Sequence, residues 1–171
     1  MTVHKESDIY RDVTFLLNLK DDHGNYLFDH VHWQLDVMWD TPKYARWDGN
    51  FLNWRDNNYN PGISKLAKDF VENLKSENPR ILGIAPFLGL LYSFYKGEKS
   101  KLRCGSGLSA FNVATGGIIT ACPIACEYDE LARIDDPNFD PEKLRNRVEV
   151  NNYCPKCEIY EDCGGRCLYA N

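Results

Sequence analysis

The hydrophobic pattern of the first forty residues predicts two strands joined by a turn. Residues 13–19 form a short apolar run, which predicts a buried strand. Residues 31–37 alternate between apolar and polar side chains, as a half-buried strand does. The polar stretch 21–25 between them predicts a turn. Pairing the two strands side by side would fit a piece of an α/β barrel, and a simple hairpin fits as well.

The next part of the pattern predicts an amphipathic helix. Apolar residues recur at steps of three and four after Pro61, which is the period of a helix with one buried face. Asn60 and Ser64 are both candidates for its N-cap, and the spacing does not choose between them. Pro79 is expected to end the helix, because the residue before a proline disfavours helical backbone.

A second helix is expected after Pro86, within the apolar stretch 81–95. The polar residues 97–100 that follow it predict a boundary between two domains. The first domain would span residues 1–97 and the second residues 98–171.

Aromatic residues concentrate between positions 26 and 59, where nine of them include all four tryptophans. They could grip a peptide substrate, but core packing is the favoured interpretation, because aromatic rings supply core area wherever they occur. The stretch 41–60 is long and rich in Asp and Asn, so it is the candidate for a mobile lid that faces substrate. His30 and His32 are candidate metal ligands, but no cysteine lies near them in the sequence, and a packing or surface role is favoured.

Composition and charge narrow the class of protein. The chain has 171 residues, 43% of them hydrophobic and 26% charged, which is ordinary for a soluble protein of one or two small domains. A net charge of −5 argues against nucleic acid as a partner. No apolar run approaches the ~20 residues of a membrane span, and the first residues lack the apolar core of a signal peptide. A cytoplasmic location without a membrane partner is therefore expected.

The chemistry of the chain is concentrated in its seven cysteines, all of which lie between positions 104 and 167. An odd number of cysteines without an export signal disfavours a disulfide framework. Zinc and iron–sulfur clusters remain, because clustered thiolates bind both. Four of the thiols form a dense run, Cys154-x2-Cys157-x5-Cys163-x3-Cys167. Its first pair has the two-residue gap that lets both sulfurs turn toward one metal centre.

The three upstream cysteines accompany glycine-rich segments; they are Cys104, Cys122 and Cys126. Glycines favour tight turns with positive φ, where the backbone can approach a bulky anion closely. Gly116-Gly117 is equally explained as the turn of a hairpin between short strands around 111–113 and 118–120. Both interpretations hold together if the hairpin presents Cys104 and Cys122 near its two ends.

This cysteine spacing resembles that of the SPASM domain, the C-terminal auxiliary-cluster domain of radical SAM enzymes that modify peptides. The family pattern is a cysteine, a variable stretch, Gly-x4-Cys, then Cys-x2-Cys-x5-Cys-x3-Cys, and a last cysteine after a gap. Six of the seven family cysteines match, within residues 98–171. The resemblance implies an α+β fold: a remnant of a radical SAM partial (β/α) barrel at 1–97, then a small Cys-rich SPASM domain with a β-hairpin and short helices.

The resemblance also implies how the cysteines are shared between two [4Fe–4S] clusters. The first cluster would be held by three cysteines with a fourth candidate, namely Cys104, Cys122, Cys167 and, as the candidate, Cys126. The second would be held by Cys154, Cys157 and Cys163. The family's last cysteine has no counterpart before Asn171, so we expect the second cluster to be incomplete or labile.

Radical SAM enzymes also carry Cys-x3-Cys-x2-Cys for the cluster that cleaves S-adenosylmethionine, whereas residues 1–103 contain no cysteine. Residues 12–40 resemble the last strands of the partial barrel. We therefore expect a C-terminal portion of a longer enzyme, isolated as a fragment or encoded by a truncated gene, and most similar to an archaeal group of peptide-modifying radical SAM proteins. Its partners would be a peptide substrate and the missing N-terminal radical SAM portion, which alone would bind S-adenosylmethionine.

The expected function is cluster binding, electron transfer and substrate docking within a radical SAM oxidoreductase that matures a peptide. The alternative is a zinc-stabilised, non-redox binding module that uses the dense run. No catalytic residue is assigned, because the common nucleophile, phosphate-loop and zinc-protease motifs are absent. Some SPASM relatives place an acidic base beside an upstream cysteine, but Pro123 follows Cys122 here. Arg166 and Lys156 are the candidates to offset the charge of an anionic cluster.

Overall fold

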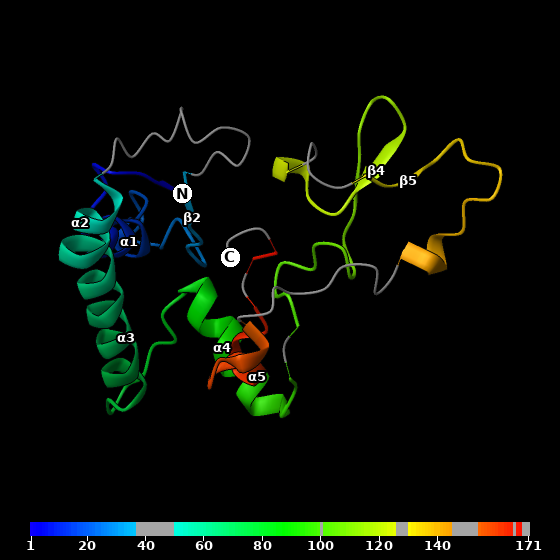
Figure 1. Ribbon diagram of the computed structural model, residues 1–171. Coiled ribbons are helices and arrows are strands. Elements are labelled where there is room, and N and C mark those ends of the chain that lie inside the picture. Colours follow the sequence, from blue (N-terminus) through cyan, green and yellow to red (C-terminus); the bar gives the residue numbers. More distant parts are fainter. Residues whose placement is uncertain (37–49, 100, 126–129, 145–153, 166, 169–171) are drawn as a thin grey trace. The chain divides into compact units, whose positions relative to one another are not determined.

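Figure 1 shows the computed structural model of the chain, which describes residues 1–36, 50–99, 101–125, 130–144, 154–165 and 167–168. The protein mixes helices with short strands, in agreement with the predicted α+β class. It divides into two compact units, of which the first contains Met1–Met38 and Lys43–Leu91 and the second contains Trp39–Pro42 and Tyr92–Asn171. In the described part of the chain, no helix is both long and apolar enough to cross a lipid bilayer.

The strand predicted at residues 13–19 is wrong, because this part of the chain forms the helix α1, Ile9–Asn18. Ile9, Val13 and Leu17 are buried and lie four residues apart, which places them on one face of a helix. The apolar run 13–19 was too short to distinguish a strand from a buried helical segment. The helix buries Val13 and Leu17 of that run, while Leu16 packs partly against the core and Phe15 is exposed.

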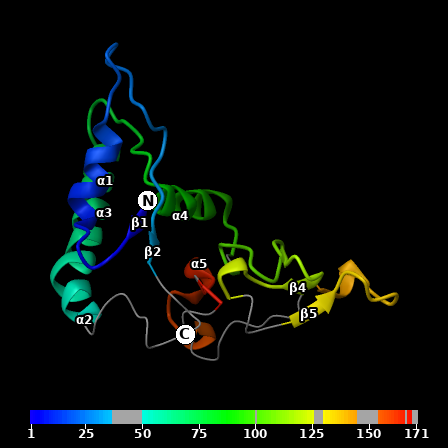
Figure 2. The same ribbon diagram turned by 90° about the horizontal axis from the view of Figure 1, so that it is seen from above.

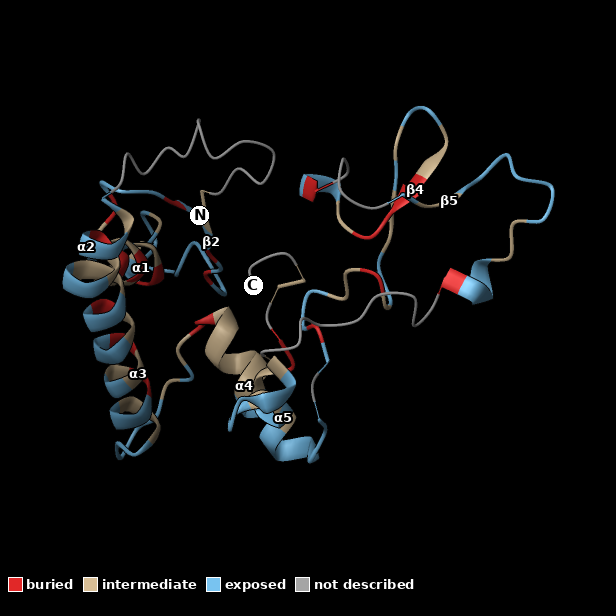
Figure 3. Cartoon of the chain, viewed as in Figure 1, coloured by how far each residue is buried: buried red, intermediate tan, exposed pale blue. Residues whose placement is uncertain are grey.

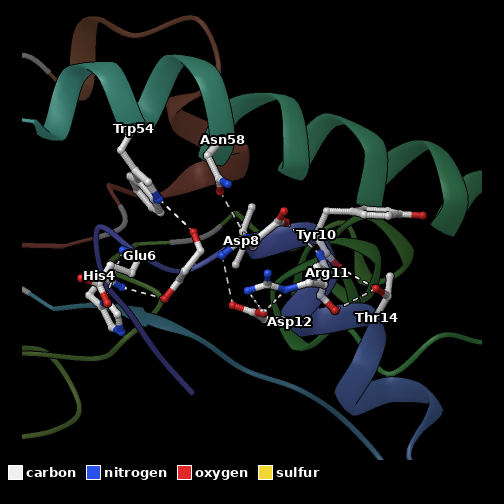
Figure 4. Close-up of polar contacts among 11 residues, drawn as sticks. His4, Glu6, Asp8, Tyr10, Arg11, Asp12, Thr14, Trp54 and Asn58 are labelled. Carbon is white, nitrogen blue, oxygen red and sulfur yellow. Dashed lines mark hydrogen bonds and ion pairs between the residues drawn. The ribbon is translucent and has the colours of Figure 1, made fainter.

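Polar contacts around Asp8 set the start of α1, and Figure 4 shows them in close-up. The Asp8 carboxylate accepts a hydrogen bond from the backbone N–H of Arg11 at 3.0 Å. In return, the backbone N–H of Asp8 donates to the Asp12 carboxylate at 3.1 Å. These bonds satisfy backbone donors that the first turn of a helix leaves without intrahelical partners.

A second helical stretch runs without a break from residue 51 to residue 74. It consists of α2 (Phe51–Trp54), the π-helical segment Arg55–Tyr59 and α3 (Asn60–Leu74). The helix predicted after Pro61 is therefore confirmed, but it belongs to a longer one. Inside a helix, proline cannot donate a backbone hydrogen bond, and its ring crowds the carbonyl four residues earlier. The wider π-helical turn just before Pro61 accommodates the proline ring.

This continuity changes two expectations for the region. Neither Asn60 nor Ser64 caps α3, because helical backbone already precedes both; the Ser64 hydroxyl instead donates to the Asn60 carbonyl at 2.9 Å. Residues 51–59 of the predicted lid are helical, so the lid prediction is wrong for them. Asn60 is helical as well, Asn50 directly precedes α2, and residues 41–49 of that prediction lie outside the described residues.

The core of the first unit is formed where α1 packs along α3, which lie side by side in Figures 1 and 2. Figure 3 shows buried and exposed positions alternating along α3, as expected for an amphipathic helix. Trp33 and Trp54 are both buried in this core, in agreement with the packing role favoured for the aromatic residues. The Trp54 indole also donates to the Ser7 carbonyl at 2.9 Å, which ties α2 to the start of α1.

A small parallel sheet completes the first unit. The strand β1 (Thr2–Val3) pairs in parallel with β2 (Gln34–Leu35), and Val31 forms a further parallel bridge with Ile84. The three segments are neighbours in chain order, with α1 between the first two and α3 between the last two. Such a β-α-β-α-β succession is how parallel sheets and α/β barrels are built.

The alternation predicted at 31–37 is confirmed in its described part, where Val31 and Trp33 are buried and His32 is exposed. Its predicted partner was wrong, because the strand pairs with β1 and not with residues 13–19. The predicted turn at 21–25 is confirmed. The hydrogen bond from the Asn25 side chain to the Asp21 carboxylate lowers the pKa of Asp21, and bonds from the backbone N–H groups of Asn25 and His23 lower this pKa further.

The helix predicted after Pro86 is confirmed as α4 (Ala85–Lys96), and the division between the two units falls within it. The predicted hairpin is also confirmed, with β3 (Asn112–Val113) antiparallel to β4 (Ile118–Thr120). A third strand, β5 (Glu130–Arg133), extends this sheet beside β4. Gly117 has the positive φ expected in the turn, 77°.

Four short helices, separated by turns and irregular segments, are also found in the described part of the second unit. They are the 3-10 turns Pro123–Ala125, Pro141–Leu144 and Cys154–Lys156, and the helix α5, Tyr160–Cys163. Arg133 stabilises the turn of the hairpin, because its guanidinium donates to the Gly116 carbonyl at 3.0 Å. The same guanidinium also donates to both carboxylate oxygens of Asp135. The bond from Arg133 lowers the pKa of Asp135, and the same bond raises the pKa of Arg133.

Candidate metal centre

The cysteine thiols are distributed over three segments of the second unit. These are the glycine turn at 104–110, the end of the hairpin at 122, and the dense run from 154 onward. Cys104 and Cys157 are exposed, whereas the thiol-bearing residues 122, 154, 163 and 167 are half-buried. Cys126, the candidate fourth ligand of the first cluster, lies outside the described residues.

Cys104 lies at the start of a tight turn that two glycines make possible. Gly105 and Gly107 have φ values of 76° and 72°, in the region that other residues disfavour. A Cβ added at Gly105 would lie 2.5 Å from the Ser109 hydroxyl oxygen, so the Ser109 side chain would have to rotate away. The positive φ expected for the Cys-Gly-Ser-Gly sequence is therefore confirmed.

The dense run folds into two consecutive helical turns joined by backbone hydrogen bonds. The N–H of Cys157 donates to the Cys154 carbonyl at 2.9 Å, and the N–H of Tyr160 donates to the Cys157 carbonyl at 3.0 Å. Gly164 then ends α5 with a φ of 72°, and its N–H donates to the Tyr160 carbonyl at 2.6 Å. The turns fix the backbone that carries Cys154, Cys157 and Cys163.

The segment before Cys104 is docked on this dense run. The backbone N–H of Leu102 donates to the Gly164 carbonyl at 2.7 Å. Leu102 is 1% exposed. Its φ of 44° is positive, which is an uncommon backbone conformation for a residue other than glycine. The Leu102 carbonyl in turn accepts from the N–H of Gly105 at 2.7 Å. A series of backbone hydrogen bonds therefore links the turn at Cys154 to the turn at Cys104.

Two side chains reinforce this docking. The Arg103 guanidinium donates to the Asp162 carbonyl and, at 3.1 Å, to the Ser93 hydroxyl. The Lys99 ammonium pairs with the Glu161 carboxylate at 2.6 Å, although an exposed ion pair of this kind adds little stability. The contacts to Asp162 and Glu161 join residues 59 and 62 positions apart, so the fold brings the upstream cysteine segment to the dense run.

Cys122 is placed by the hairpin, two residues after β4. Thr120 is buried, and its hydroxyl accepts from the Asn112 amide at 3.2 Å and donates to the Cys122 carbonyl at 3.4 Å. The prediction that the hairpin presents Cys122 at one end is confirmed. Cys104 lies in the separate glycine turn that precedes β3. It therefore comes before the hairpin in the sequence, as predicted, but it does not lie at an end of the hairpin itself.

The donor set suits an iron–sulfur centre, but the described sulfurs are not assembled into one. Thiolates are the ligands that such clusters take, and the described part of the second unit carries six cysteines close to turns of positive φ. Within the described ranges, however, no three side chains of His, Cys, Asp or Glu converge as a metal site requires.

The remaining candidate residues lie as follows. His30 and His32 are exposed beside β2, and the His32 carbonyl accepts from the N-terminal ammonium at 2.6 Å. Lys156 is exposed next to Cys157, and Arg166 lies outside the described residues. Sequence reasoning missed Leu102 and Gly164, the residues whose backbones make the docking contact. The Gly164-Gly165 pair directly after Cys163 was the available signal, since both glycines have positive φ.

Replacing Gly164 with alanine is expected to loosen this docking. A residue with a Cβ costs about 1–2 kcal/mol in the left-handed conformation, and Gly164 is buried with a φ of 72°. The amide of Leu102 should then exchange its hydrogen about tenfold faster, since each 1.4 kcal/mol is about a factor of ten. Gly97→Ala is the matched control, because Gly97 has a φ of 65° and open space around it. Equal acceleration in both variants would contradict the docking role.

Comparisons with known proteins add no family to this geometry. No protein-family model matches the chain, and no curated protein or solved structure matches it. The assignment of a function therefore depends on the cysteine spacing and on the contacts described above.

Proposed function

We propose that the chain is the auxiliary [4Fe–4S] cluster-binding, electron-transfer and substrate-docking portion of a peptide-modifying radical SAM enzyme. The proposal comes from the SPASM-like spacing of the cysteines. The observation that carries it is the backbone hydrogen bond from Leu102 to Gly164. The family pattern assigns Cys104 and Cys167 to the same cluster although they are far apart in sequence, and this bond ties together the two segments that carry them.

The first unit supports the same proposal. Its strands are parallel neighbours in chain order, with a helix between each pair. Successive strands of a (β/α) barrel have this relationship. Residues 1–97 would then be the remnant of a partial barrel, and the parent enzyme would supply the site for S-adenosylmethionine. The peptide substrate and the N-terminal radical SAM portion would be the partners of this chain.

A bound [4Fe–4S] cluster would supply a one-electron acceptor or relay. Cys104, Cys122 and Cys167 would hold the first cluster, with Cys126 as the candidate fourth ligand, and Cys154, Cys157 and Cys163 would hold the second. Lys156 places a positive charge beside a ligand of the second cluster, which offsets the negative charge of the thiolates.

The proposal predicts the iron and sulfide content of protein purified without oxygen. About eight iron and eight sulfide per chain, with a visible shoulder near ~400 nm, are expected for two cubane clusters. Because the second cluster lacks its fourth cysteine, the content should fall toward about four of each on repeated desalting. Cys104→Ser should remove the stable portion of the iron, and Cys157→Ser the labile portion.

Ser109→Ala is the control for the cysteine variants, because Ser109 lies in the same glycine turn as Cys104 and is exposed. It should keep the iron content of the unchanged chain. One zinc per chain with no sulfide and no colour would contradict the proposal, since zinc in thiolate sites is colourless. That result would favour the zinc-stabilised, non-redox module.

A further inference from the structure

The first two cysteines of the dense run lie on one tight turn. Residues Cys154–Lys156 form a 3-10 turn, which the hydrogen bond from the Cys157 N–H to the Cys154 carbonyl closes at 2.9 Å. In 3-10 geometry the side chains of residues i and i+3 lie on the same side. The two Cα atoms of such a turn are within about 7 Å, and a disulfide needs a Cα separation of about 4.4–6.8 Å. The turn therefore places the two cysteines on the same side, at a separation that a disulfide can span.

The surroundings of the two residues favour reaction between them. Cys157 is exposed and forms no disulfide, so a reagent in solution can reach its thiol. Cys154 is half-buried. Pro155 lies between them and restricts the backbone, so little conformational freedom is lost on closing the ring.

We propose that Cys154 and Cys157 are a redox-modification site, which a small-molecule disulfide of the glutathione class oxidises to an intrachain disulfide. The Cys157 thiolate attacks a sulfur of oxidised glutathione, forms a mixed disulfide and releases one glutathione thiolate. The Cys154 thiolate then attacks the Cys157 sulfur and releases the second glutathione. The pair loses two electrons and two protons, and oxidised glutathione takes them up as it becomes two molecules of reduced glutathione.

Formation of the disulfide does not depend on the proposed cluster. The effect of the disulfide on cluster loading, however, rests on the proposed function. The oxidised pair has no thiolate left to donate to a metal. Oxidation and loading of the second cluster would therefore exclude each other. Reduction of this pair would then be the first requirement for assembling that cluster.

The experiment uses the full chain, stripped of metal by a chelator, reduced, desalted, and incubated with oxidised glutathione. Remaining thiols are alkylated, and the protein is cut after Lys156 by trypsin and after Glu158 by a glutamate-specific protease. The second cut separates Cys157 from Cys163. Two of the seven thiols should be lost, and the peptide with Cys154 should remain linked to the peptide 157–158 until it is reduced.

Two variants make the result specific. Cys154→Ser should keep glutathione bound to Cys157, because the thiol that resolves the mixed disulfide is gone. Cys163→Ser is the matched control and should still form the link between Cys154 and Cys157. A link from Cys154 to Cys163, a stable glutathione adduct in the unchanged chain, or thiol loss spread evenly over the other cysteines would overturn the inference. These outcomes are read without iron, so they are independent of the cluster measurement.

Discussion

Gly83→Ala is expected to destabilise the first unit by about 3 kcal/mol, the upper part of the range for forced overpacking. A Cβ at Gly83 would lie 2.0 Å from the Asp29 carbonyl oxygen and 2.8 Å from the His30 Cα. Both are backbone atoms, so rotation of a side chain cannot relieve the clash. The Gly83 carbonyl also accepts from the Val31 N–H at 2.6 Å, and the bridge between Val31 and Ile84 would have to separate.

Urea unfolding followed by circular dichroism measures this effect. Gly116→Ala is the control, because a Cβ there meets nothing within 4 Å. It should change the free energy of unfolding by no more than about 0.5 kcal/mol, as surface substitutions usually do. A Gly83→Ala protein as stable as the control would mean that the third parallel segment does not lie against residues 29–31.

Leu66→Ala is expected to cost about 2–5 kcal/mol, the range for removing a fully buried leucine side chain. Leu66 is 1% exposed and lies in α3, within the core that α3 forms with α1. Its loss leaves a cavity between these elements, and the surrounding side chains can fill that cavity only in part.

The same helical stretch offers a control with the same chemistry. Leu52 in α2 is 59% exposed, so Leu52→Ala removes the same atoms from a side chain that is mostly in water. The free energy of unfolding should change by less than about 0.5 kcal/mol. Similar costs for the two substitutions would contradict the packing of α3 described here.

The helices α3 and α4 and the hairpin could be predicted because their signals are local. Apolar residues at helical spacing determine α3, and a glycine pair between two short β-prone runs determines the turn between β3 and β4. The region of α1 was mispredicted because the apolar run at 13–19 was treated alone. Including Ile9 would have shown the four-residue spacing, and Asp8 is a typical N-cap just before it.

Other features have no sequence signature that could have been used. The strand β1 spans only two residues, too few to show an alternation, and its pairing with β2 depends on contacts distant in sequence. The cysteine positions could be singled out from their spacing. The docking of Leu102 on Gly164 could not be predicted from the sequence. It is a hydrogen bond between two backbone groups, which almost every residue type carries, so only the backbone conformation of Gly164 restricts the residue type.

The separation of 62 residues between Leu102 and Gly164 has a consequence for biosynthesis. At about 5–20 residues per second, the ribosome needs about 3–12 s to extend the chain from one residue to the other. The turns around Cys104 and the hairpin beside Cys122 form from local contacts within that interval. Docking of the Cys104 turn on the dense run follows synthesis of the segment around Gly164, and assembly of the proposed first cluster would follow it too.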